Sequence, residues 1–139
     1  MICPACGAVE YPRIGPCILA AVTNGDRLLL TRYARQKGNL VLVAGFMEIG
    51  ETAEQCVARE VLEETGVKVK NIRYAGSQPW GFSGVVSMAF TAELDGSEAI
   101  QVDNNELSEA FWLRREEIPD PPYTCSLTSE LIRSFKRGE

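Results

Sequence analysis

Three glutamates between residues 60 and 64 have the type and spacing to do chemistry. Glu60, Glu63 and Glu64 would share one patch of surface on an α-helix, because residues three and four apart are neighbours there. Each exposed pair of like charges costs roughly a few tenths of a kcal/mol. Hard, oxygen-seeking cations such as Mg²⁺ or Mn²⁺ would convert the cluster into a metal site. The alternative is a solvated acidic helix face without chemistry.

The absence of histidine leaves carboxylates as the groups that must carry any reaction. With no histidine in the chain, serine-type triads, imidazole acid–base catalysis and histidine metal sites are excluded. The net charge of −5 repels nucleic acids and other polyanions. No DNA partner is therefore expected, and a phosphate-bearing substrate would need cations.

Length and composition indicate one soluble domain. The chain has 139 residues, with 45% hydrophobic and 24% charged residues, which suits a single globular core. Its longest apolar stretches, such as Cys17 to Val22, are too short to span a bilayer. The first residues lack the basic and apolar regions of a secretory signal. We expect a cytoplasmic protein with no membrane partner.

The glutamates fall in a segment with clear helix boundaries. Thr52 and Gln55 form a capping-box pattern, and Gly66 is a C-terminal stop. The helix should run from about Ala53 to Thr65. At helical spacing, the side facing a sheet is expected to carry Ala53, Val57, Val61 and Leu62. Glu60, Glu63 and Glu64 are expected on the opposite side of the helix.

The remaining elements predict a mixed sheet between helices. A hairpin is expected over 16–23 and 27–33, then a polar loop over 36–39 and a buried strand over 40–44. Further strands are expected over 72–75, 85–91 and 111–113, with turns at 95–96 and 104–105. A second amphipathic helix is indicated by Leu127, Leu131, Ile132 and Phe135.

The segment 45–67 resembles the signature of the Nudix hydrolases at every position. The matching residues are Gly45, Glu51, Arg59, Glu60, Val61, Glu63, Glu64, Gly66 and Val67. The resemblance implies an α/β fold, an α/β/α sandwich with a mixed β-sheet between helices. It also implies divalent-metal-dependent hydrolysis of a nucleoside diphosphate linkage.

Metal ligands follow from the same resemblance. It implies that Glu60 and Glu64 are the chief ligands and that Glu63 assists or binds a further ion. The carbonyl of Ala44 would complete the site, and Glu106 resembles an additional metal-binding glutamate. Family members assign the general base to different carboxylates, so it stays open here.

Arg59 and Gly45 have supporting roles in this interpretation. The guanidinium fork of Arg59 can hold a carboxylate such as Glu51 and orient the loop against the helix. Gly45 would allow the backbone to approach a metal or phosphate closely, or it is a simple turn glycine.

A second segment resembles the NAD(H) diphosphatase branch of the family. Ser77-Gln78-Pro79-Trp80, followed by Gly81-Phe82-Ser83, is similar to an array that marks this branch. The branch cleaves NADH or NAD to nicotinamide mononucleotide and AMP, and some members remove NAD caps from RNA. The residues expected to bind substrate are Phe46, Gln78, Pro79, Trp80, Phe82 and Thr128.

Alternatives remain for the aromatic residues and for the substrate. Trp80 and Phe82 could form a packed core pair, and Phe46 and Tyr11 could be core residues rather than stack on a base. The segment also departs from the branch, which has prolines at the positions of Gly81 and Ser83, usually serine at that of Val85 and a small alanine at that of Thr128. ADP-ribose or a nucleoside triphosphate is therefore an alternative substrate, and a nucleotide-sensing module without catalysis is an alternative class.

The N-terminal cysteines resemble half of a zinc ribbon. Cys3-x-x-Cys6-Gly, followed by Tyr11-Pro12-Arg13, is similar to the second half of the ribbon that precedes the catalytic domain in this branch. We expect residues 1–15 to be a residual half-ribbon segment and 16–139 the Nudix domain. Structural zinc needs four ligands. The pair is thus a metal-free turn, or two subunits of a homodimer share one zinc. The other thiols, Cys17, Cys56 and Cys125, are expected to be buried.

Overall fold

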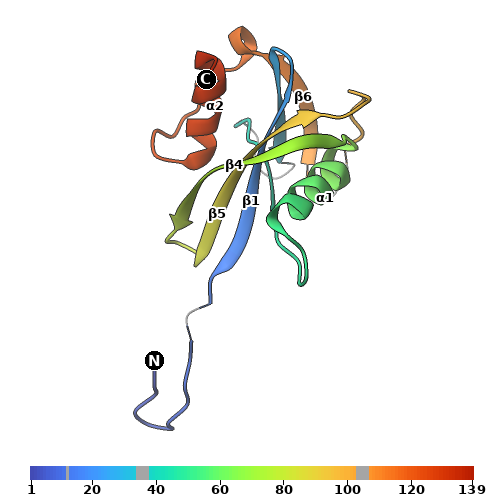
Figure 1. Ribbon diagram of the computed structural model, residues 1–139. Coiled ribbons are helices and arrows are strands. Elements are labelled where there is room, and N and C mark those ends of the chain that lie inside the picture. Colours follow the sequence, from blue (N-terminus) through green and yellow to red (C-terminus); the bar gives the residue numbers. More distant parts are fainter. Residues whose placement is uncertain (12, 34–37, 103–106) are drawn as a thin grey trace.

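One mixed β-sheet organises the chain (Figure 1). The computed structural model describes residues 1–11, 13–33, 38–102 and 107–139. The strands are β1 (Gly15–Asn24), β2 (Arg27–Tyr33), β3 (Val43–Phe46), β4 (Val69–Trp80), β5 (Val85–Leu94) and β6 (Leu107–Arg114). Their order is β4-β5-β1-β2-β6, and β3 pairs with β1. The β1–β5 pair is parallel and the other pairs are antiparallel.

The two longer helices, α1 (Ala53–Thr65) and α2 (Leu127–Arg137), lie on opposite sides of this sheet (Figure 1). A short 3₁₀ helix, η1 (Arg115–Glu117), follows β6. Alternate residues of a strand point to opposite faces, so Ile18, Ala20 and Val22 pack with the α1 side. Ala21 packs with Ile132 and Phe135 of α2. The predicted α/β/α sandwich is confirmed.

Helix α1 begins and ends where the sequence predicted. Both hydrogen bonds of the capping box between Thr52 and Gln55 are present, and Gly66 is left-handed at φ 71°. The prediction for Leu62 was wrong, because its side chain is 44% exposed. The buried stripe instead runs through Val57, Val61 and Glu64, at the i, i+4, i+7 spacing of one helix face.

Strand predictions held for the hairpin and needed correction elsewhere. The hairpin is β1 and β2, but β3 begins at Val43 rather than at residue 40, and Val41 makes an isolated bridge to Thr31. β4 extends well beyond the predicted 72–75 and ends at Trp80. It is an edge strand with mostly exposed side chains, so the alternation that reveals half-buried strands is weak. Its edge position accommodates Pro79.

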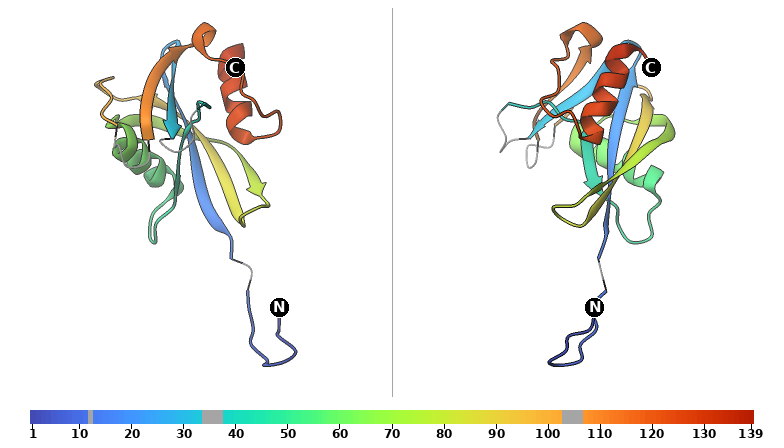
Figure 2. Two further views of the ribbon diagram at one scale, coloured as in Figure 1. Left: turned by 180° about the vertical axis from the view of Figure 1, so that it is seen from behind. Right: turned by 90° about the vertical axis from the view of Figure 1, so that its left-hand side faces the viewer.

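The N-terminal residues stand away from the sheet as a small hairpin-like turn (Figure 2). Ile2 and Val9 form a bridge, and the Cys3 N–H donates to the Ala8 carbonyl at 2.8 Å. The Gly7 N–H closes the turn on the Cys3 carbonyl at 2.9 Å. Among the described residues, neither α1 nor α2 has the length and hydropathy of a bilayer-crossing helix.

Candidate active site

Arg59 joins the loop after β3 to helix α1 through several hydrogen bonds. Its Nε and Nη2 donate to the two carboxylate oxygens of Glu51 at 2.8 and 3.0 Å. Nη1 donates to Glu60 at 2.8 Å and to Glu63 at 3.1 Å. Nη2 also donates to the Phe46 carbonyl at 3.0 Å. The predicted bidentate pair with Glu51 is therefore present, and the same guanidinium orients two of the three helix glutamates.

The ion pair has a clear electrostatic consequence for Glu51. Hydrogen bonds from Arg59, and then from the Glu48 N–H, lower the pKa of Glu51 to about 2. The bond to Glu51 in turn raises the pKa of Arg59. A carboxylate this acidic, with both oxygens engaged, is a poor general base near neutral pH. Glu51 is thus suited to holding the loop rather than to moving a proton.

Gly45 makes room for the Glu60 carboxyl group. A Cβ placed on Gly45 would lie 1.9 Å from Glu60 Cδ and 2.1 Å from its Oε1. Gly45 lies inside β3, paired with Ile18, so the alternative of a simple turn glycine was wrong. The close approach of the Gly45 backbone to a metal or phosphate stays a prediction. The glycine lets a carboxylate reach the backbone of β3 directly beside Ala44.

The three helix glutamates are not equivalent. Glu64 is only 8% exposed, whereas the Glu63 side chain is largely in solvent. The expectation that all three lie opposite the core was wrong for Glu64, which follows Val61 on the inward-facing stripe. Cys17 on β1 lies near Glu60 and Glu64. Burial is the main cause that raises the pKa of the Cys17 thiol, and the charges of the two glutamates also raise it. A protonated thiol thus lies close to both carboxylates.

Exposed aromatic side chains lie at the end of the sheet where β1 begins. Trp80 and Phe82 meet edge to face with ring centroids 5.5 Å apart, and they are 46% and 91% exposed. Phe46 and Tyr11 are also exposed. A core role was therefore wrong for all four. The strand register pairs Trp80 with Val85, Val85 with Gly15 and Phe46 with Cys17, so Phe46 and Trp80 lie at the same end of the sheet.

Gln78, predicted to bind substrate, contacts the segment that leads into α2. Its Nε2 donates to the Cys125 carbonyl at 2.8 Å, and its Oε1 accepts from the Leu127 N–H at 2.9 Å. Thr128 is the second residue of α2 and is half-buried, whereas Pro79 is exposed on β4. The sequence did not predict this link, because Cys125 and Leu127 lie 47 and 49 positions after Gln78 and no local pattern marks the contact.

The cysteines divide into exposed and buried groups. Cys3 and Cys6 are exposed on the N-terminal turn, and N–H groups of Cys6 and then Ala5 lower the pKa of Cys3. Cys56 is buried beneath the loop after β3, and burial raises its pKa to about 12. The expectation of a buried thiol was wrong for Cys125, because the segment before α2 runs over the surface.

The family follows from comparison with known proteins. Residues 13–134 match the NUDIX domain model. The chain belongs to the Nudix family. It is 51% identical over 120 residues to a NAD-capped RNA hydrolase NudC of Photobacterium profundum, covering 86% of this chain and 45% of the relative. The corresponding NudC of Escherichia coli O1:K1 / APEC is 46% identical over 133 residues, covering 95% and 51%. The resemblance to the NAD(H) diphosphatase branch is confirmed.

Solved structures agree with this family assignment. A NUDIX hydrolase from Nitrosomonas europaea is 27% identical with a TM-score of 0.81, covering 98% of this chain and 78% of the other. An ADP-ribose pyrophosphatase from Streptococcus suis 89-1591 is 22% identical with a TM-score of 0.71, covering 92% of each chain, which shows the shared fold. The chain spans about half the length of the curated relatives it matches.

The oxygen donors of the Nudix helix fit a hard divalent cation in kind. Glu60, Glu64 and the adjacent carbonyl of Ala44 are the hard ligands that Mg²⁺ and Mn²⁺ prefer. Within the described ranges no three acidic or thiol side chains are already gathered as a cage. Mg²⁺ does not require one, since it commonly keeps several waters beside one or two carboxylates. Glu106 lies outside the described residues.

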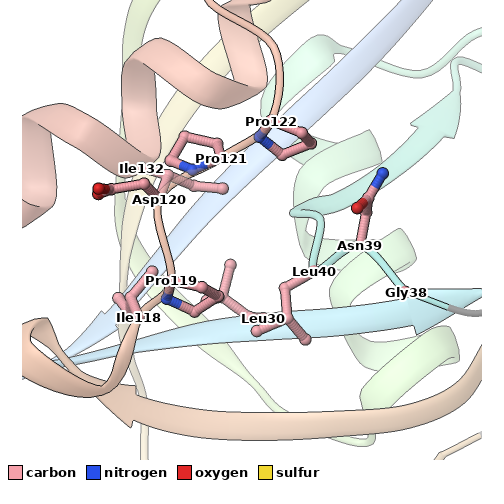
Figure 3. Close-up of a pocket in the computed structure, with 10 residues that line it drawn as sticks. All are labelled: Leu30, Gly38, Asn39, Leu40, Ile118, Pro119, Asp120, Pro121, Pro122 and Ile132. Carbon is pink, nitrogen blue, oxygen red and sulfur yellow. The ribbon is translucent and has the colours of Figure 1, made fainter.

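A separate pocket of about 140 Å³ lies on the α2 side of the sheet (Figure 3). It is lined by Leu30, Gly38, Asn39, Leu40, Ile118, Pro119, Asp120, Pro121, Pro122 and Ile132. None of the described residues predicted for metal or substrate binding is among these.

Proposed function

We propose that this chain hydrolyses a nucleoside diphosphate linkage with the help of Mg²⁺ or Mn²⁺, and that NADH or NAD is cleaved to nicotinamide mononucleotide and AMP. The observation that carries the proposal is the Arg59 network. It fixes Glu51, Glu60 and Glu63 in a segment that matches the family signature, and the relatives are named NAD-capped RNA hydrolases.

In this proposal Glu60 and Glu64 hold the cation together with the Ala44 carbonyl. When bound, the cation neutralises charge on the diphosphate and on its leaving oxygen. Glu63 is exposed beside them, which suits a further ion or the activation of water, and Glu106 would be an additional ligand. Arg59 acts by positioning these carboxylates, since the contacts of its guanidinium are with protein groups.

The exposed aromatic side chains supply the surface for the substrate's planar rings. Trp80, Phe82 and Phe46 are accessible at the end of the sheet, and stacking of a base on an aromatic side chain contributes roughly 1–3 kcal/mol. Pro79 and Thr128 flank the same region. The substrate class includes small dinucleotides and the NAD cap of an RNA, and excludes DNA.

A homodimer belongs to the same proposal. Ile14 and Ile49 are exposed apolar side chains, and Cys3 and Cys6 project on the N-terminal turn. Two copies could together supply the four thiols of one zinc site. Zinc analysis of purified protein alongside its mass in solution tests this part: metal-free dimers would leave the cysteine turn without a metal role.

The experiment that tests the activity is a chromatographic product assay. NADH, NAD and ADP-ribose are incubated separately with Mg²⁺ or Mn²⁺, each with a chelator control. Nicotinamide mononucleotide and AMP from NADH or NAD would support the proposal. AMP from ADP-ribose alone would mean that Gly81 and Ser83 accompany a different specificity, and nucleotide binding without turnover would favour a sensing module.

A further inference from the structure

Gln78 ties the edge strand β4 to the start of helix α2. Both ends of its amide are used: the nitrogen faces the Cys125 carbonyl at 2.8 Å and the oxygen faces the Leu127 N–H at 2.9 Å. Turning the amide over would place donor against donor and acceptor against acceptor. The two bonds therefore fix the orientation of the side chain.

Further side chains hold the same backbone segment. Arg133 of α2 donates to the Tyr123 carbonyl at 2.6 Å and to the Thr124 carbonyl at 3.3 Å. The Ser126 side chain caps α2 by accepting from the Ser129 N–H at 3.2 Å. These contacts order the segment against its own helix, whereas the bonds of Gln78 attach it to the sheet. Core packing holds the body of α2 through Ile132 and Phe135, and Gln78 attaches the start of the helix to β4.

The two ends of this connection each carry a residue of the proposed substrate site. Gln78 and Trp80 point to the same side of β4, because residues two apart in a strand share a face. Leu127, which Gln78 holds, is followed by Thr128. We propose that Gln78 is a positioning residue that sets the separation between Trp80 and Thr128, and so the width of the substrate site, rather than a group that binds substrate. This inference rests on the proposed function.

Two substitutions at Gln78 and one matched control test the inference. Gln78→Leu removes both hydrogen bonds, and Gln78→Glu keeps the acceptor for Leu127 N–H but loses the donor to Cys125. Arg73→Gln changes an exposed residue of the same strand. Hydrogen exchange of residues 123–128 and steady-state kinetics with NADH are measured for each protein, well below its melting temperature.

The expected results separate positioning from general stability. Gln78→Leu should speed exchange of the Leu127 amide about tenfold, the scale of one or two lost hydrogen bonds. It should also raise KM about tenfold while kcat stays within about threefold, since a merely less stable enzyme loses kcat through its active fraction. The exchange rate and KM of Gln78→Glu should fall between those of Gln78→Leu and the wild type. Both quantities in Arg73→Gln should match the wild type.

Two results would overturn the inference about Gln78, and a third would overturn the proposed function instead. Unchanged exchange in Gln78→Leu would show that the connection does not order the segment. Faster exchange with unchanged KM would show that its order does not matter for substrate. A wild-type protein that neither binds nor cleaves NADH would overturn the proposed function, and the exchange measurement, which needs no substrate, would still report on the connection.

Discussion

The Glu60 carboxyl group lies so close to Gly45 that no side chain fits between helix α1 and strand β3 at this point, since a Cβ on Gly45 would be 1.9 Å from Glu60 Cδ. A glycine and a glutamate 15 residues apart in the sequence thus form one structural unit. The glycine serves the placement of a carboxylate, and the backbone of Ala44 lies next to it.

Gly45→Ala should therefore destabilise the fold by about 1–3 kcal/mol, the usual cost of overpacking a close contact. Urea unfolding measures the effect, and a double-mutant cycle assigns its cause. In a Glu60→Ala background the same change should cost less than about 1 kcal/mol, because the clashing group is gone. Gly15→Ala is the control, since its nearest neighbour would be 3.4 Å away. An equal cost in both backgrounds would contradict the contact.

Glu51→Gln should lower stability at neutral pH, with the loss disappearing in acid. The pKa of Glu51 in the folded protein is about 2, against an ordinary value of 4.5. Its charged form therefore stabilises the fold above the ordinary pKa, and this stabilisation is lost as pH falls toward about 2. Unfolding of both proteins is compared from about pH 7 downward. A difference that stays constant across this range would argue against the ion pair with Arg59.

Trp80→Ala and Phe82→Ala should weaken substrate binding without weakening the fold. Loss of one stacking surface of roughly 1–3 kcal/mol predicts that KM for NADH rises about fivefold to a hundredfold. The melting temperature should change little, because neither side chain belongs to the buried core. Tyr74→Ala removes another exposed aromatic side chain of β4 and should leave KM unchanged. An unchanged KM in both the Trp80→Ala and the Phe82→Ala variant would place substrate elsewhere.

The five thiols should react in a defined order in the native protein. Cys3, Cys6 and Cys125 are exposed and should react first with a thiol reagent, followed by the half-buried Cys17. Cys56 is buried with a pKa of about 12, so its thiolate is scarce at neutral pH and it should react only on unfolding. Added zinc should protect Cys3 and Cys6 if two subunits share an ion. Rapid reaction of Cys56 would contradict its placement under the loop.

Features with local causes were predictable from the sequence. The bounds of α1 were correct because the Thr52–Gln55 capping box and the left-handed Gly66 are short-range signals. The ion pair of Arg59 and Glu51 was predictable because Arg59 lies on a helix whose bounds were predicted correctly. The full length of β4 was not, because an edge strand with exposed side chains lacks the alternating pattern.

Features that depend on distant partners escaped prediction. The bonds of Gln78 to the segment before α2 join residues 47 and 49 positions apart, and a glutamine carries no signal of its partner. The burial of Glu64 was missed because its charge suggested solvent, although its helical spacing from Val57 and Val61 placed it on the core side. In both cases tertiary packing decided the environment of a polar side chain.

The Mg²⁺ dependence of NADH hydrolysis by Glu64→Gln, beside the wild type and Glu54→Gln, tests the central claim most directly. Glu54 is an exposed residue in the first turn of the same helix. Wild type and Glu54→Gln should turn over at the same Mg²⁺-dependent rate and stop with chelator. Glu64→Gln should lose roughly a thousandfold in kcat, the scale of several kcal/mol from a bound cation. Hydrolysis that survives the chelator, or a Glu64→Gln rate equal to wild type, would contradict a metal-dependent site on this helix.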